Sequence, residues 1–265
     1  MGKIAALQLP TLPMNEAKLD YYARICDKKD IRLVVLGEYV LNSFFKELEK
    51  MSKNMIKEQS THKIKMLQNI CKKYNLTIIA PIIRVINGKF EKSILKASAK
   101  SMRYYPQYFF INFKHWNEEK FFHQEDVPYN LPTLTHEGLK YALIMGYELH
   151  FDYIWEQIDK KRVDGVLIPS VSTFSSKQRW DEMLRCRAFT HNVYILRVNR
   201  IGMYKESRTD WYFYGNTALI DPHGEIENNL HDEEAMLVAD LDKNKVNEAR
   251  NLWGWRKALS KKGLL

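Results

Sequence analysis

The sequence predicts an α/β protein with mixed sheets. Apolar, β-branched runs alternate with stretches whose apolar residues recur at helical spacing, which is typical of strands joined by helices. An Asn87-Gly88 pair between two strand-like runs adds an antiparallel hairpin to this alternation. The chain has 265 residues, of which 45% are hydrophobic, and this is enough for one large core. We therefore expect one domain that spans residues 1–265.

The first half of the chain predicts a β-α-β unit followed by a helix and a hairpin. The expected elements are a strand at residues 3–8, a helix at 15–29, a strand at 31–36, a helix at 61–74, and strands at 76–83, 93–97 and 104–110. Leu19, Ala23 and Cys26 recur at helical spacing and support the first helix. The run 76–83 is so apolar and β-branched that it predicts a strand buried on both faces.

The second half repeats the alternation of strands and helices. The expected elements are a strand at residues 141–145, a helix at 153–160, a strand at 165–168, a helix at 177–191, strands at 194–199 and 217–220, a short strand at Glu225, a strand at 236–240 and a helix at 243–252. Asp221-Pro-His-Gly224 predicts a tight turn before Glu225.

Composition and charge argue against several classes of protein. No apolar run approaches the roughly 20 residues that span a bilayer, and the first residues lack the features of a signal peptide or a myristoylation signal. We therefore expect a cytosolic protein with no membrane association. The formal net charge is +9, but the 41 basic residues are interleaved with 32 acidic ones, so no nucleic-acid-binding arm is predicted.

The three cysteines, Cys26, Cys71 and Cys186, are an odd number without metal-like spacing, and all fall in predicted helices. We expect free thiols that are buried or half-buried, with no disulfide. Neither a metal site nor a cofactor is predicted.

Two strand ends carry the candidate functional positions. Leu33-Val-Val-Leu-Gly-Glu38 places Glu38 at the carboxyl end of a buried strand, where open α/β sheets gather their ligand groups. The alternative is a glutamate that points to water or caps the next helix. Ala142-Leu-Ile-Met-Gly146 is a second buried strand that runs into a sharp turn. Because glycine tolerates positive φ, we expect Gly146 to occupy a strained turn.

These stretches resemble the nitrilase superfamily of carbon–nitrogen hydrolases. The family's strand end reads apolar-Cys-Tyr-Asp/Glu, so the resemblance places Gly146 at the position of the nucleophilic cysteine. Glu38 matches the family's general base, although Gly37 replaces the proline that usually precedes it. In Phe113-Lys-His-Trp-Asn-Glu-Glu-Lys-Phe-Phe122, Lys114 matches the catalytic lysine and Glu119 the second glutamate. Further matches extend from the first predicted strand to the last.

The resemblance implies a four-layer α-β-β-α sandwich, the nitrilase or carbon–nitrogen hydrolase fold, and a homodimer or higher homo-oligomer paired through helices beside the active site. It also implies a pocket for a small amide, carbamoyl or acyl compound, and the basic balance favours an anionic one. The residues expected to line that pocket are Tyr147, Glu148, His115, Trp116 and Ser172.

The missing nucleophile leaves three hypotheses about function. In a cysteine amidase the thiolate attacks the carbonyl, a glutamate takes the proton and a lysine stabilises the oxyanion. Glycine has no side chain that could start this reaction. The first hypothesis is a pseudoenzyme that binds a small molecule. The second is an active hydrolase that uses an activated water or another nucleophile such as Ser170, Ser172 or Thr173; a variant is that Gly146 was introduced to silence it. The third, a basic nucleic-acid-binding protein, is disfavoured by the interleaved charges.

Overall fold

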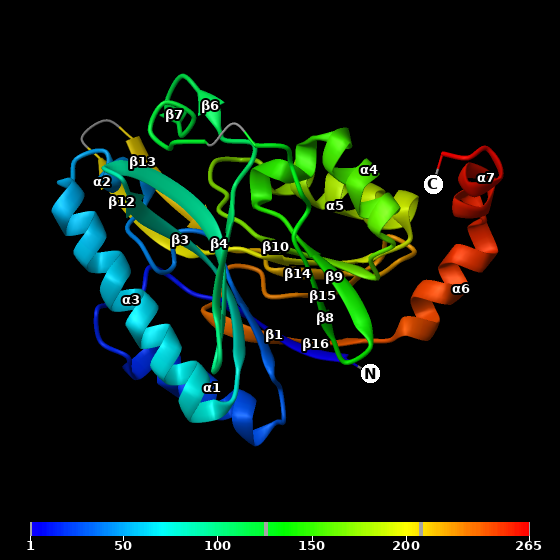
Figure 1. The fold of residues 1–265 in the computed structure, drawn as a ribbon, viewed down its shortest axis with the longest axis horizontal. Coiled ribbons are helices and arrows are strands. Elements are labelled where there is room, and N and C mark those ends of the chain that lie inside the picture. Colours follow the sequence, from blue (N-terminus) through cyan, green and yellow to red (C-terminus); the bar gives the residue numbers. More distant parts are fainter. Residues whose placement is uncertain (1, 125–126, 207–208, 265) are drawn as a thin grey trace.

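The computed structural model describes residues 2–124, 127–206 and 209–264, and its framework is a pair of six-stranded sheets (Figure 1). The first sheet has the order β16 (Ala235–Leu241), β1 (Gly2–Gln8), β2 (Leu33–Leu36), β3 (Thr77–Ile86), β4 (Lys89–Ser98) and β5 (Met102–Pro106). The second has the order β15 (Ile226–Asn229), β14 (Ala218–Ile220), β11 (Tyr194–Val198), β10 (Gly165–Pro169), β9 (Leu139–Leu143) and β8 (Thr133–His136).

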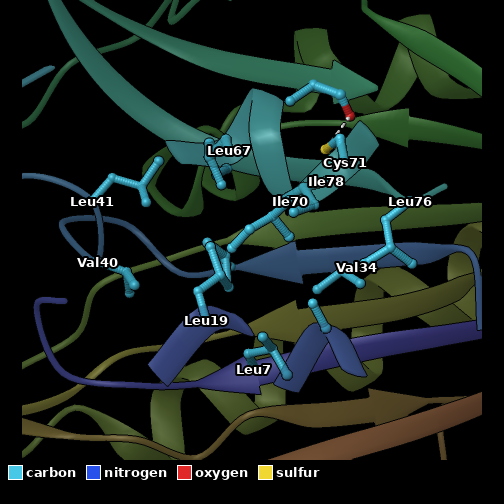
Figure 2. Packing of buried hydrophobic residues seen from close by; sticks show 14 of the residues in the cluster. Leu7, Leu19, Val34, Val40, Leu41, Leu67, Ile70, Cys71, Leu76 and Ile78 are labelled. Carbon is cyan, nitrogen blue, oxygen red and sulfur yellow. Dashed lines mark hydrogen bonds between the residues drawn. The ribbon is translucent and has the colours of Figure 1, made fainter. Parts of the chain in front are cut away.

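Helices cover the outer face of each sheet. The helices α1 (Ala17–Lys28) and α3 (Lys53–Tyr74) pack on the first sheet, while α4 (Asp152–Lys161) and α5 (Lys177–His191) pack on the second (Figure 1). Figure 2 shows the first of these contacts, in which Leu19 of α1 and Ile70 of α3 lie against side chains of the sheet. The predicted four-layer α-β-β-α sandwich is therefore confirmed.

The two sheets pack on each other through a second core. In β1, Ala5 and Leu7 face the helices, whereas Ile4 and Ala6 face the other sheet. Strands covered on both faces are apolar where they are covered, which is why β2 (Leu33–Leu36) is apolar throughout and its parallel neighbour β1 has polar side chains only at Lys3 and Gln8.

Several elements differ from the sequence prediction. Helix α3 begins at Lys53 rather than at residue 61, because the Ser52 side chain accepts a hydrogen bond from the Met55 amide and caps an earlier turn. The elements that the sequence did not predict are α2 (Phe45–Leu48), β6 (Asn112–Phe113), β7 (Trp116–Asn117), β8 (Thr133–His136), the 3-10 turn η1 (Gly146–His150), the hairpin β12 (Ile201–Glu206) and β13 (Thr209–Tyr214), and α7 (Trp255–Lys261), which follows α6 (Lys243–Trp253). None of the helices in the described ranges is both long and apolar enough to cross a bilayer.

Candidate active site

Three strand ends meet at one edge of the sandwich. The Glu38 amide after β2 donates to the Ser170 carbonyl after β10 at 3.1 Å, and the Gly146 amide after β9 donates to Glu38 Oε1 at 3.3 Å. Gly37 lets the end of β2 lie against the residues after β11, since a Cβ there would lie 3.0 Å from the Asn199 carbonyl carbon. The two sheets thus bring Glu38 and Gly146 together as the sequence predicts.

A buried ion cluster surrounds Glu38. The ammonium of Lys92, on β4, lies 2.5 Å from Glu38 Oε2 and 2.9 Å from Glu118 Oε1. All three residues are at most 3% exposed. Glu118 also accepts hydrogen bonds from the Tyr39 hydroxyl and the Trp116 indole N–H. Each charge of the cluster is therefore paired or hydrogen-bonded, as burial requires.

The charges of this cluster affect how its members titrate. Burial raises the pKa of Glu38, and this effect outweighs the attraction of Lys92. Burial also acts to lower the pKa of Lys92, but Glu118 and Glu38 outweigh it and the pKa is raised. Two carboxylates share one ammonium, so the raised pKa of Glu38 relieves the excess negative charge.

Lys114 and Glu119 do not join Glu38, and this corrects the sequence prediction. Both side chains are exposed, and Lys92 and Glu118 occupy the expected places beside Glu38. The reason is the short β6–β7 hairpin, in which Phe113 pairs with Trp116 and Lys114 lies in the exposed turn between them. The chain then buries Glu118 rather than its neighbour.

A signal for Lys92 is nevertheless present in the sequence. Lys92 lies two residues before Ile94, so both side chains share one face of β4, and Ile94 packs in the core between the sheets. A lysine on the inner face of a buried strand needs a partner of opposite charge, and this marks it as a candidate.

Gly146 is buried. The residue types that fit at this position are limited by space rather than by backbone conformation. It is absent from the residues with positive φ, so the expected strained turn is wrong. A Cβ at this position would lie 2.6 Å from Ser170 Cβ and 3.1 Å from Glu38 Oε1. The Ser170 side chain therefore fills the volume that a larger residue at position 146 would need.

A pocket of about 430 Å³ opens beside Glu38. Of the residues expected to contact a ligand, His115, Trp116, Tyr147 and Ser172 line it. The rest of its wall is largely formed by the segment from 171 to 176 and by the start of α5. Ser170 is 0% exposed and does not line the pocket, whereas Thr173 does.

Glu148 holds the backbone together and does not line the pocket, contrary to the sequence prediction. Its buried carboxylate accepts hydrogen bonds from the amides of Met145 and Tyr108, both at 2.8 Å, and of Phe109 at 3.4 Å. Burial raises the pKa of Glu148 to about 7, against the effect of these hydrogen bonds. This side chain thus fixes the turn that contains Gly146.

The cysteines lie away from the pocket. Cys26 and Cys71 are buried in α1 and α3, and none of the three lines the pocket. Cys186 is exposed on α5, so the expectation that it is at least half-buried is wrong.

Comparisons with known proteins agree with this architecture. A family model described as carbon-nitrogen hydrolase matches residues 3–251. A hydrolase of the agr operon of Staphylococcus aureus is 19% identical over 253 residues, which are 94% of each chain. An omega-amidase of Saccharomyces cerevisiae is 22% identical over 259 residues, with 91% of this chain and 87% of that protein covered.

Solved structures show the same fold at low sequence identity. The carbon-nitrogen hydrolase from Helicobacter pylori G27 has a TM-score of 0.82 at 16% identity, with 97% of this chain and 94% of that chain covered. A mutant of the amidase from Nesterenkonia sp. AN1 has a TM-score of 0.77 at 16% identity, with 96% of this chain and 98% of that chain covered. That mutant is described with acrylamide added to its active-site cysteine.

Replacing Lys92 tests the buried cluster. Lys92→Met leaves two carboxylates without their ammonium and is expected to lower the free energy of unfolding by about 3–5 kcal/mol at neutral pH. The loss should shrink as pH falls, because the carboxyls become neutral. Urea denaturation measures both effects. Lys114→Met is the matched control and should change stability by less than about 0.5 kcal/mol; equal effects of the two variants would show that Lys92 is not paired as described.

The raised pKa of Glu148 predicts an unusual pH dependence. Its ordinary value is 4.5 and its folded value is about 7, so between them the folded chain holds a proton that the unfolded chain has released. The stability of the wild type relative to the non-titrating Glu148→Gln should therefore fall as pH rises from about 5 to about 7, by on the order of 3 kcal/mol, and stay constant above. Urea denaturation of both proteins across this range tests it; parallel curves would contradict the raised pKa.

Proposed function

The chain belongs to the carbon-nitrogen hydrolase family, and we propose that it is a pseudoenzyme of this family, which binds a small amide, carbamoyl or acyl compound without cleaving it efficiently. The pocket beside Glu38 is the binding site in this proposal. Its volume of about 430 Å³ suits a small molecule.

The observation that carries the proposal is the packing of Gly146 against Ser170. By the family resemblance, covalent hydrolysis would start from a thiolate at position 146, and glycine supplies none. A Cβ there would lie 2.6 Å from Ser170 Cβ, so the neighbouring side chain fills the space of the absent one. Ser170 itself is not a substitute nucleophile, since it is fully buried and does not line the pocket.

The retained groups suit binding. Glu38 lines the pocket, while Lys92 and Glu118 lie behind it and hold its carboxyl in place. A carboxyl fixed in this way can hydrogen-bond an amide or acyl group, and the raised pKa of Glu38 increases the share of the neutral form that can donate. Trp116 and Tyr147 add aromatic surface.

Hydrolysis by an activated water is the second candidate, and the position of Glu38 favours it. A buried carboxyl with a raised pKa that lines a pocket has the properties of a general base. Removing the nucleophile from a covalent hydrolase costs about a millionfold in turnover, while the remaining groups retain roughly a thousandfold over water. The proposed pseudoenzyme and this alternative therefore differ in measurable turnover.

We also propose that two copies pair through the outer faces of α4 and α5, the arrangement that the family resemblance implies. Tyr153 on α4 is 45% exposed and would be covered there. Light scattering after gel filtration measures the mass in solution, and a monomer would contradict this arrangement.

A turnover assay separates the two candidate functions. Purified protein is expected to release no more ammonia from ω-amides, N-carbamoyl amines or nitriles than Glu38→Gln does, because neither protein has a thiol at position 146. Turnover of the wild type that Glu38→Gln abolishes would reject the pseudoenzyme and establish hydrolysis with Glu38 as the general base.

Restoring a thiol tests the packing argument. Gly146→Cys alone should lower the free energy of unfolding by about 1–3 kcal/mol through overpacking against Ser170. Adding Ser170→Gly removes the clashing Cβ and should recover most of that loss, with Ser170→Gly alone as the control. Urea denaturation reports stability, and alkylation by iodoacetamide, counted by mass against the wild type with its exposed Cys186, reports whether the new thiol reacts.

Two outcomes of the same experiment are decisive. A single Gly146→Cys variant as stable as the wild type would show that position 146 has room, against the packing argument. Hydrolysis of an ω-amide by the double variant would show that Glu38 and Lys92 are still arranged for catalysis and that only the nucleophile is missing.

A further inference from the structure

A strained aromatic residue lies at the edge of the pocket. Phe174 is in the segment between β10 and α5, lines the pocket and is 49% exposed. Its φ of +61° falls in the left-handed region. A bulky side chain rarely adopts this conformation, and such strain is concentrated at ligand sites. Burial of the ring does not explain the strain, because the residue stays half-exposed.

The neighbouring residues fix this conformation. Thr173 pairs with Phe213 in an isolated antiparallel bridge, and its hydroxyl donates to the Tyr212 carbonyl at 2.7 Å. The Ser176 hydroxyl donates to the Thr173 carbonyl and the Ser176 amide to the Phe174 carbonyl, both at 2.9 Å. None of these bonds involves the Phe174 ring. The folded chain therefore holds the backbone that presents the ring, whatever the side chain contributes.

The Phe174 ring lies between two cavities. Beside the pocket is a second cavity of about 320 Å³, and the described residues that line it are His115, Phe174, Thr209 and Trp211. His115 and Phe174 line both cavities. The ring centre of Phe174 is 5.1 Å from that of Trp211 and 5.5 Å from that of His115. The two cavities therefore adjoin along a wall of rings.

The second cavity favours an apolar group. None of the described residues that line it has a permanent charge. Trp211 is 3% exposed and packs edge-to-face against Trp116, with ring centres 5.8 Å apart, so it forms a fixed part of the wall. Aromatic rings bind another ring by stacking or edge contact in addition to the apolar area that is buried. A flat aryl group suits this wall.

We propose that the two cavities bind one molecule, an amide or acyl compound whose head lies beside Glu38 and whose aryl tail lies against Phe174 in the second cavity. This inference rests on the proposed function and adds the chemical class of the ligand. The pocket beside Glu38 holds the small head, and the tail covers the ring surface of Phe174 that is otherwise exposed. Phe174 is then the residue that selects the tail.

A pair of amides tests this selectivity. Butyramide and 4-phenylbutyramide share the amide head and the carbon chain, and they differ only in the terminal ring. The ratio of their dissociation constants therefore measures what the ring contributes. The wild type is expected to bind 4-phenylbutyramide about tenfold more tightly than butyramide. NMR titration measures both constants, and ammonia release in the same samples measures turnover.

Variants at position 174 assign the preference to this ring. Phe174→Ala removes the ring and Phe174→Leu replaces it by an aliphatic group; each should reduce the preference to about threefold or less. Phe174→Tyr keeps a ring and should keep the preference. Circular dichroism checks that each variant is folded, and Phe174→Leu decides the matter if Phe174→Ala is not.

Tyr212→Ala is the matched control. Tyr212 is a 51% exposed aromatic residue on the adjacent strand β13, and it lines neither cavity. Its removal should leave the preference unchanged. An equal loss in Tyr212→Ala and Phe174→Ala would show that the aryl group binds exposed rings without selection, which would overturn the inference.

The outcomes separate this inference from the proposed function. Equal affinity for the two amides, or a preference that survives both Phe174→Ala and Phe174→Leu, would overturn the inference and leave the pseudoenzyme proposal standing. Binding of neither amide would overturn both. A preference for 4-phenylbutyramide that depends on Phe174 and is accompanied by steady ammonia release would support the inference and reject the pseudoenzyme.

Discussion

The structure around the pocket depends on one ammonium held between two carboxylates. Lys92 on β4 joins Glu38 after β2 to Glu118 after β7, three segments that the sequence keeps far apart. The cluster is buried, so removing Lys92 would leave two carboxylates without their counter-ion, which costs several kcal/mol. The same constraint fixes the carboxyl of Glu38 where it lines the pocket, because one of its oxygens bonds Lys92 and the other accepts from Gly146.

The sequence predicts the layers and the strand ends better than the side chains that meet there. Strands covered on both faces are apolar throughout and helices are periodic, so the order of elements follows from local pattern, and Glu38 is found because it directly follows such a strand. Lys92 is marked only by its place on the inner face of a strand, and the acid that pairs with it comes from another segment that no local pattern identifies. Lys114 and Glu119 fit a motif by spacing, yet the pairing of a two-residue hairpin decides that Glu118 is the buried acid.

Gly146 shows why an absent side chain need not leave an empty space. Truncating a buried residue normally leaves a cavity, and the cost grows with its volume. Here the Ser170 side chain occupies the volume next to the glycine, and Arg197 binds that serine. The glycine has ordinary backbone angles, so packing, not positive φ, explains its presence. Position 146 and its neighbours are thus adapted to each other, and a larger residue could enter there only if Ser170 moved.

The distribution of buried charge says more about the pocket than the surface charge does. The net charge of +9 is spread over interleaved side chains in water, where each is screened within about 10 Å. Beside the pocket, by contrast, the cluster of Glu38, Lys92 and Glu118 has one acid in excess, and Arg197 has a cation in excess. Glu38 attracts Arg197 at longer range, and in a medium of low dielectric this attraction is only weakly screened by solvent. The two carboxylates and the two cations therefore balance one another within the protein, and the net charge of the surface does not show this.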